Sequence, residues 1–222
     1  MCNLYRMTKN ASEVAAWFDA VEGVGGANFA AEVYPGYTGP VVAQGELRVM
    51  TWGFPLVLKS AKGQPLKPKP VNNARDDKLG AAFWRESFVQ RRCLIPLTGW
   101  GEAEGARGRM TRTWLSLGGL ALPDTPLFAA AGMWRPSDEW GDCYTMVMTD
   151  SAGTAAASVH ERMPVLLAPE DYACWTSGTP DEAFRLCRGW EGPLAIDRTN
   201  EPWAKAAAAS APPPPPVQPG LF

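Results

Sequence analysis

The sequence predicts a single α+β domain built mainly from β-strands. Short runs of β-branched, aromatic and other apolar residues alternate with glycine, proline and aspartate turns, a pattern typical of sheet proteins. These runs are residues 47–54, 93–97, 114–117, 127–134, 144–148 and 163–167. A chain of 222 residues can bury a substantial core without disulfides or metals. No internal repeat marks a second domain.

A few helices are expected beside the strands. Over residues 10–22, apolar residues recur at the i, i+3, i+4 and i+7 spacing of one helix face, with Asn10 or Ser12 as the N-cap. Those apolar residues are Val14, Trp17, Phe18 and Val21. Further helices are expected over residues 78–89, from Pro169, and from Thr179 to Cys187. In the last of these, Thr179, Pro180 and Glu182 fit the N-cap, N1 and capping-box positions.

Two segments lack the composition of regular elements. Residues 63–70 hold three prolines and two lysines and predict a mobile surface loop. Residues 205–222 hold four consecutive alanines and then five consecutive prolines, and such a sequence cannot bury a core. We therefore expect a folded domain over residues 1–204 and a disordered tail over residues 205–222.

Composition excludes several classes of protein. The chain is 46% hydrophobic and 20% charged, and it contains neither an apolar run of about 20 residues nor a basic-then-apolar leader. Its five cysteines form no CxxC pair and His160 is the only histidine, so the ligand sets of zinc ribbons and multi-histidine centres are missing. We expect a cytoplasmic protein with reduced thiols and neither metal nor cofactor.

Positive charge is concentrated in one stretch of a chain whose net charge is −2. Residues 48–92 hold ten lysines and arginines against three acidic residues, whereas the rest holds 11 basic and 20 acidic residues. The aromatic residues interleaved with this stretch are Trp52, Phe54, Phe83 and Trp84. Basic and aromatic side chains together are typical of single-strand grooves, but a solvated basic loop between core aromatics has the same pattern.

Cys2 is the most informative single position. Removal of Met1 would leave an N-terminal cysteine, a 1,2-aminothiol whose amine has a pKa of about 7.7 to 8.0 and whose thiol has one of about 8.5. Such a group can act as a nucleophile with its own amine as base. It can also condense with an aldehyde to a Schiff base and then a thiazolidine. A cysteine at position 2 can equally be chance in a frayed terminus.

Three further clusters hold polar residues that packing does not explain. Asn73 and Arg75 lie two residues apart and would share one face of an extended segment, where Arg75 can bind a phosphate. Glu102 follows an apolar strand and a glycine pair, a setting that raises a carboxyl pKa. His160 and Arg162 precede a buried strand. Singly, each also fits turn chemistry, a surface ion pair or a satisfied histidine.

Taken together, these residues resemble the SRAP family (SOS response-associated peptidases, the abasic-site processing proteins). The resemblance extends from Met1 to about Trp203, and its motifs occur in the family's order and spacing. They are Met1-Cys2, Trp52-Gly53, Asn73-Ala74-Arg75, Cys93-Leu94-Ile95-Pro96, Gly99-Trp100 with Glu102, Ala131-Gly132-Met133-Trp134, and His160 with Arg162-Met163-Pro164-Val165. The family fold implies a partly barrel-like mixed or antiparallel sheet with flanking helices.

The resemblance implies a DNA-repair protein that binds single-stranded DNA and links itself covalently to abasic sites. Cys2 would attack the ring-opened sugar aldehyde and form a thiazolidine. Asn73 matches the asparagine that positions the cysteine and the lesion. Glu102 matches the carboxylate that moves protons during ring opening and Schiff-base formation, and His160 matches the imidazole that assists it.

The same resemblance implies DNA contacts. Arg75 would hold the phosphate beside the lesion, Trp52 would stack on or wedge beside the bases, and Arg162 is a weaker phosphate ligand. The chain departs from the family at three places. Cys2 is followed by Asn-Leu instead of Gly-Arg, which leaves Arg6 as a substitute. Gly101 and Ala103 replace aromatics beside Glu102, and Asp77 replaces the usual glutamate.

Two other functions remain open at the level of sequence. Cys2 can be the nucleophile of a peptidase or hydrolase with His160 as base, and removal of its own N-terminal peptide would be compatible with DNA linking. Alternatively, the departures can have left a non-covalent single-strand binder. We expect a monomer without membrane partners, associated with the nucleoid when bound to DNA.

Overall fold

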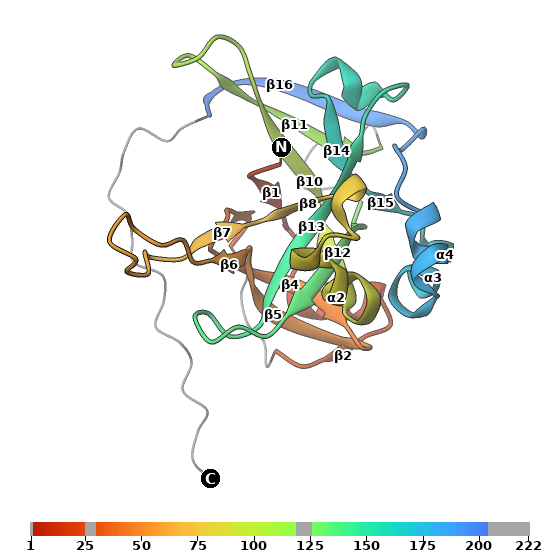
Figure 1. Cartoon of the computed structure of the whole chain (residues 1–222). Coiled ribbons are helices and arrows are strands. Elements are labelled where there is room, and N and C mark those ends of the chain that lie inside the picture. Colours follow the sequence, from red (N-terminus) through yellow and green to blue (C-terminus); the bar gives the residue numbers. More distant parts are fainter. Residues whose placement is uncertain (1, 25–29, 119–125, 204–222) are drawn as a thin grey trace.

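The computed structural model describes residues 2–24, 30–118 and 126–203. The expected tail over residues 205–222 lies outside them. Five strands of the larger sheet close into a ring in the centre of the molecule (Figure 1). They are β4 (Thr38–Ala43), β5 (Glu46–Trp52), β9 (Arg92–Leu97), β12 (Phe128–Arg135) and β13 (Cys143–Asp150). All neighbours in the ring are antiparallel except β13 and β5, whose parallel pairing closes it.

Short strands extend this ring at its edges. β2 (Val21–Glu22) pairs with β5, and β15 (Leu166–Leu167) pairs with β12. β13 carries two additional partners, β8 (Asn73–Arg75) in parallel and β14 (Arg162–Pro164) in antiparallel orientation. The register pairs Asn73 with Met146 and Arg75 with Met148. β13 therefore places both sequence motifs, Asn73–Arg75 and His160–Arg162, on the same part of the sheet.

A second sheet packs beside the ring and carries Glu102 (Figure 1). Its antiparallel order is β16 (Leu194–Pro202), β11 (Thr111–Leu117), β10 (Gly99–Glu104), β1 (Tyr5–Arg6) and β3 (Glu32–Val33). Only Thr98 separates β9 of the ring from β10 of this sheet. A third, two-stranded unit, β6 (Phe54–Leu56) with β7 (Lys69–Val71), forms the base of an arm that projects from the ring (Figure 1).

The helices at Asn10 and Thr179 begin at the predicted N-caps, and the observed helices are shorter than the predicted ranges. α1 (Ala11–Trp17) begins at Asn10 with a capping box, but it ends early because Asp19 adopts a φ of 48°. The predicted apolar face is therefore wrong at its end, where Trp17 and Val21 are exposed. α2 (Ala82–Gln90) follows a 3-10 turn. Past Pro169, another 3-10 turn leads into α3 (Tyr172–Ser177), and Thr179 caps α4 (Pro180–Arg185).

All six predicted strand regions contain strand, and two are interrupted. The run over residues 47–54 breaks at Gly53, which has a φ of 120° and lies so close to Pro70 that a Cβ would be 2.9 Å from its Cα. The run over residues 163–167 breaks at Val165, whose N–H instead reaches Val147 O at 2.9 Å. β4, β10 and β16 were not predicted, because glycine, proline and charged residues dilute their apolar patterns. The expected loop over residues 63–70 is largely exposed, but its last two residues belong to β7 and pair with β6.

Arg92 joins two helices to the ring. Its side chain is buried and donates to backbone carbonyls at the ends of α2 and α3. The acceptors are Phe88 at 2.6 Å, Val89 at 3.3 Å, Trp175 and Gly178. Carbonyls at helix ends have no partner within the helix, so one guanidinium satisfies several groups that burial would otherwise leave unpaired.

Replacing Arg92 with alanine is expected to destabilise the fold. The variant leaves buried carbonyls without donors and removes charge-assisted hydrogen bonds, so we expect the free energy of unfolding to fall by about 3–5 kcal/mol. Urea denaturation followed by tryptophan fluorescence measures this change. The exposed Arg85→Ala variant on α2 is the matched control and should stay within about 0.5 kcal/mol of wild type. Equal stability of both variants would contradict the role of Arg92.

Candidate active site

Two adjacent asparagine side chains hold Cys2 in place. The Asn73 amide donates to Cys2 O at 2.6 Å, and the Asn72 amide donates to the same oxygen at 3.0 Å. Downstream, Gly101 N on β10 donates to Leu4 O at 2.9 Å. The N-terminal segment is thus fixed between β8 on one side and β10 on the other. The structure places Cys2 in the interior and not in a frayed terminus, because its side chain is fully buried.

Asn73 offers a further acceptor at this position. The residue is 8% exposed, and its amide nitrogen is engaged by Cys2. In the described part of the chain, the buried Oδ1 has no hydrogen-bond partner. A buried acceptor without a partner costs free energy, and this one lies on a side chain that contacts the Cys2 backbone. It can accept a hydrogen bond from a donor bound beside Cys2.

Glu102 is a buried carboxyl group next to Cys2. It lies on β10 opposite Thr113 of β11 and is 2% exposed. Burial raises the pKa of Glu102 to about 7, because a low-dielectric environment disfavours the charged form. Burial, reinforced by the charge of Glu102, also raises the pKa of the Cys2 thiol above its usual range. At neutral pH the thiol is therefore protonated, and Glu102 exchanges a proton readily.

His160 lies on a loop that is tied to the strand of Glu102. Its Nδ1 is 3.0 Å from the backbone N–H of Arg162, and burial lowers its pKa, so the ring is neutral at pH 7. Arg198 of β16 forms an ion pair with Glu104 at 3.0 Å and also reaches Ser158 O at 3.5 Å. This link connects the His160 loop to β10, two residues beyond Glu102. No sequence signal identified Arg198 or Glu104.

The two predicted phosphate ligands lie on the strands that flank β13. Arg75 on β8 forms a two-bond fork with Asp77, with Nε–Oδ1 and Nη2–Oδ2 distances of 2.8 and 2.7 Å. Arg162 on β14 has its Nη1 3.9 Å from Asp76. Arg75 is opposite Met148 and Arg162 is opposite Asp150, so both arginines belong to the same end of β13.

Trp52, which the family resemblance places on or beside the DNA bases, has no exposed surface in this structure. Its ring is fully buried between Tyr5 and Tyr144, with centroid separations of 5.0 and 6.4 Å. Its Nε1 donates to Asn72 O at 3.0 Å, and the Asn72 side chain in turn holds Cys2. Trp52 therefore fixes the backbone of Asn72, whose side chain binds Cys2. Two other aromatic residues of the basic stretch, Phe54 and Trp84, are also buried.

The departures near Glu102 are accommodated by repacking. Trp114 lies opposite Gly101, and a Cβ at Gly101 would be 3.3 Å from Leu4 Cδ2 and 3.4 Å from the Trp114 ring. Trp114 and Leu4 thus occupy the space beside this glycine. Arg6, the expected substitute for the missing arginine, lies 3.5 Å from the centroid of Trp114 and 3.6 Å from Glu32.

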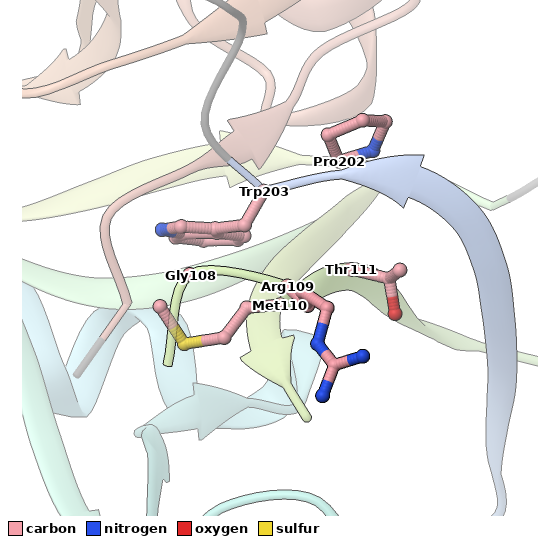
Figure 2. A pocket seen from close by; sticks show the side chains of 6 residues that line it. All are labelled: Gly108, Arg109, Met110, Thr111, Pro202 and Trp203. Carbon is pink, nitrogen blue, oxygen red and sulfur yellow. The ribbon is translucent and has the colours of Figure 1, made fainter. Parts of the chain in front are cut away.

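A separate pocket of about 270 Å³ lies at the tip of the hairpin between β10 and β11. Figure 2 shows the Trp203 ring over Met110 and Arg109. The lining residues are Gly108, Arg109, Met110, Thr111, Pro202 and Trp203, which include none of the predicted site residues. Among the described residues, no group of three histidine, cysteine or acidic side chains is placed to hold a metal ion. No helix there is long and apolar enough to cross a membrane.

Comparison with known proteins shows the family to which the chain belongs. The family model described as "SOS response associated peptidase (SRAP)" matches residues 1–197. The chain belongs to the SRAP family. A search of curated proteins gives no significant match, whereas solved structures share the fold of this SRAP protein, which confirms the predicted mainly β domain with a partly closed sheet.

Three of these structures cover 89% of the SRAP chain each. A Bordetella bronchiseptica protein has 20% identity and a TM-score of 0.71, with 99% of its own length covered. A Bacteroides thetaiotaomicron protein has 19% identity and a TM-score of 0.69, with 91% covered. A phage-related protein from Bordetella bronchiseptica has 16% identity and a TM-score of 0.61, with 94% covered. At these identities the similarity shows a common fold.

The raised pKa of Glu102 predicts a pH-dependent stability. The folded chain keeps a proton on Glu102 up to about pH 7, whereas the unfolded chain releases it near pH 4.5. The free energy of unfolding should therefore lose about 3 kcal/mol between these pH values. The Glu102→Gln variant cannot release this proton, so its free energy of unfolding should not show this decrease. The difference in free energy of unfolding between the variant and wild type should therefore shift by about 3 kcal/mol in favour of the variant between pH 4.5 and pH 7. Urea denaturation at several pH values measures it.

The exposed Glu170→Gln variant is the control for this comparison. Its stability should follow that of wild type across the whole pH range. If Glu102→Gln also followed wild type, the Glu102 carboxyl would not titrate near pH 7.

Proposed function

We propose that this SRAP protein binds single-stranded DNA and links itself covalently to abasic sites through Cys2. The observation that carries the proposal is the burial of Cys2 between the Asn73 amide and the Glu102 carboxyl group. Both asparagine amides bind the Cys2 carbonyl oxygen and fix the start of the chain, and the Cys2 side chain is fully buried. Membership of the SRAP family supports the same chemistry.

The reaction begins with removal of Met1, which exposes the α-amine of Cys2. The amine attacks C1′ of the ring-opened abasic sugar, and loss of one water molecule gives a Schiff base. The Schiff base takes up a proton on nitrogen. The thiol then gives its proton to a nearby base and its sulfur bonds to C1′, while the π pair of the C=N bond moves to the nitrogen, which gives a thiazolidine. The raised pKa of the Cys2 thiol favours this order, because the amine is the better nucleophile until a base removes the thiol proton.

Glu102 is suited to both proton transfers in this sequence. A group with a pKa of about 7 can protonate the sugar ring oxygen or the departing hydroxyl and can later accept the thiol proton. The neutral His160 ring is a second proton carrier. The Asn73 Oδ1 atom is suited to orient the amine by accepting one of its hydrogens. The three side chains thereby divide orientation and proton transfer between them.

The basic surface for DNA is centred on the hairpin arm, which we define as residues 54–71. It contains four exposed lysines and no acidic residue: Lys59, Lys62, Lys67 and Lys69. None of these lysines forms an ion pair with another described residue. In the chain the arm is followed by Asn72 and by β8, which begins at Asn73 (Figure 1), and we expect a DNA strand bound along its lysines to extend toward Cys2. Exposed Leu58 and Leu66 offer apolar contact surface to the bases.

A peptidase is the second candidate, favoured by the family's description. Hydrolysis of an amide by cysteine requires a thiolate. The raised pKa of Cys2 works against a standing thiolate in this site. DNA linking through the amine avoids that requirement, and we therefore prefer it.

Mixing the protein with a single-stranded oligonucleotide that carries one abasic site tests the linkage. Intact mass spectrometry should show a species equal to protein without Met1 plus DNA minus one water. Cys2→Ala should give no such species, and Asn73→Ala should form it at least tenfold more slowly. A stable adduct from Cys2→Ala, or none from wild-type protein that has lost Met1, would contradict the proposal. Cys2-dependent cleavage of peptides without any DNA adduct would favour the peptidase.

The role of the hairpin arm is tested by its salt dependence. In a Cys2→Ala background, which measures binding alone, replacing all four arm lysines with alanine should weaken binding to single-stranded DNA. The slope of log K against log salt should decrease in magnitude by about 2–3, since each phosphate contact contributes about 0.7. The control variant removes the same charge elsewhere, at the exposed residues Arg107, Arg109, Arg185 and Arg188. Equal slopes in both variants would exclude the arm as the DNA surface.

A further inference from the structure

Arg75 and Asp77 form the most regular charged contact near the site. The two oxygens of Asp77 accept from Nε and Nη2 of Arg75 at 2.8 and 2.7 Å, which is the parallel two-bond geometry that guanidinium groups make with carboxylates and phosphates. Both side chains are 45% exposed. Hydrogen bonding between them raises the pKa of Arg75 and lowers that of Asp77.

Asp77 is itself held by the sheet. It lies in the 3-10 helix η1 (Asp76–Lys78), which follows β8 directly. The N–H of Asp77 donates to Asp76 Oδ1 at 2.8 Å, and Asp76 Oδ2 accepts from Thr149 of β13 at 2.7 Å. The carboxylate that contacts Arg75 is therefore anchored to the strand that positions Asn73.

This geometry leaves one edge of Arg75 for another ligand. A guanidinium group has two edges that can form paired hydrogen bonds, one with Nε and one Nη atom and the other with both Nη atoms. Asp77 takes the first edge. Within residues 2–24, 30–118 and 126–203, Nη1 of Arg75 has no hydrogen-bond partner, so the second edge can take an anion while the first stays bound.

We propose that Asp77 is a positioning residue that fixes the plane of the Arg75 guanidinium group so that its Nη1–Nη2 edge binds the DNA phosphate beside the abasic site. This inference rests on the proposed function, since it concerns the DNA strand that Cys2 attacks. A free arginine loses rotamer freedom when it binds a phosphate, whereas an arginine already fixed by Asp77 has lost that freedom in advance. Asp77 thereby strengthens DNA binding although it carries the same charge sign as DNA.

The sign of the effect separates positioning from simple electrostatics. If Asp77 acted only through its charge, removing it would tighten DNA binding, because one repulsive carboxylate would be lost. If Asp77 positions Arg75, removing it weakens binding by about three- to tenfold. Asp77→Glu should restore most of the affinity, since glutamate can form the same fork with Arg75.

The test measures binding by fluorescence anisotropy in a Cys2→Ala background. The probe is a labelled single-stranded oligonucleotide with a tetrahydrofuran abasic analogue, which has no aldehyde. Asp77→Ala and Asp77→Asn should raise the dissociation constant about three- to tenfold, and Asp77→Ala should have no effect when Arg75→Ala is also present. Asp181→Ala removes the same charge from exposed α4 and should leave the dissociation constant unchanged. Thermal unfolding verifies that the variants fold.

Tighter or equal binding by Asp77→Ala would overturn the inference, as would an equal loss in the Arg75→Ala background. Failure of the proposed function has a different signature. In that case the wild-type protein would form no adduct with abasic DNA, and the inference would fall with it. An adduct from wild type together with unchanged affinity of the Asp77 variants would overturn only the role of Asp77.

Discussion

The hydrogen bond from the Asn73 amide to the Cys2 carbonyl is the contact on which the site depends. It exists because β8 pairs in parallel with β13, in a register that aligns Asn73 with Met146. β13 in turn closes the ring through its parallel pairing with β5. Closure of the ring thus fixes β13, β13 fixes β8, and β8 fixes the start of the chain. An N-terminal residue, which frays in most proteins, becomes a buried reactive group through this sequence of contacts.

Burial determines the chemistry that these groups can perform. The same desolvation raises the pKa of the Glu102 carboxyl and of the Cys2 thiol, which leaves one group able to exchange protons near neutral pH and the other protonated. An exposed glutamate would be ionised and would be a poor acid at pH 7. The cost is stability, since a buried ionisable group destabilises the folded state as the pH rises. Burial of the apolar side chains of the ring strands stabilises the fold and offsets this cost.

Three aromatic residues of the basic stretch, Trp52, Phe54 and Trp84, lie in the interior, where they pack against other side chains. Trp52 donates a hydrogen bond to the Asn72 carbonyl oxygen, and the Arg135 guanidinium lies 4.1 Å from the Phe54 ring centroid. The basic stretch exposes lysines and aliphatic side chains on the hairpin arm, not a tryptophan. Trp114 and Leu4 fill the space beside Gly101.

The fold class, the helix caps at Asn10 and Thr179, the six strand regions and the family could be predicted from the sequence, because they depend on local periodicity, capping chemistry and short motifs. The sequence also identified Cys2, Asn73 and Glu102 as residues of interest. The three-dimensional arrangement was needed to show that Asn72 joins them, that Arg198 links the His160 loop to β10, and that Trp52 is buried. These relations depend on pairing between strands far apart in the chain. A sequence pattern records which residues are apolar or charged, but it does not record which strand lies beside which.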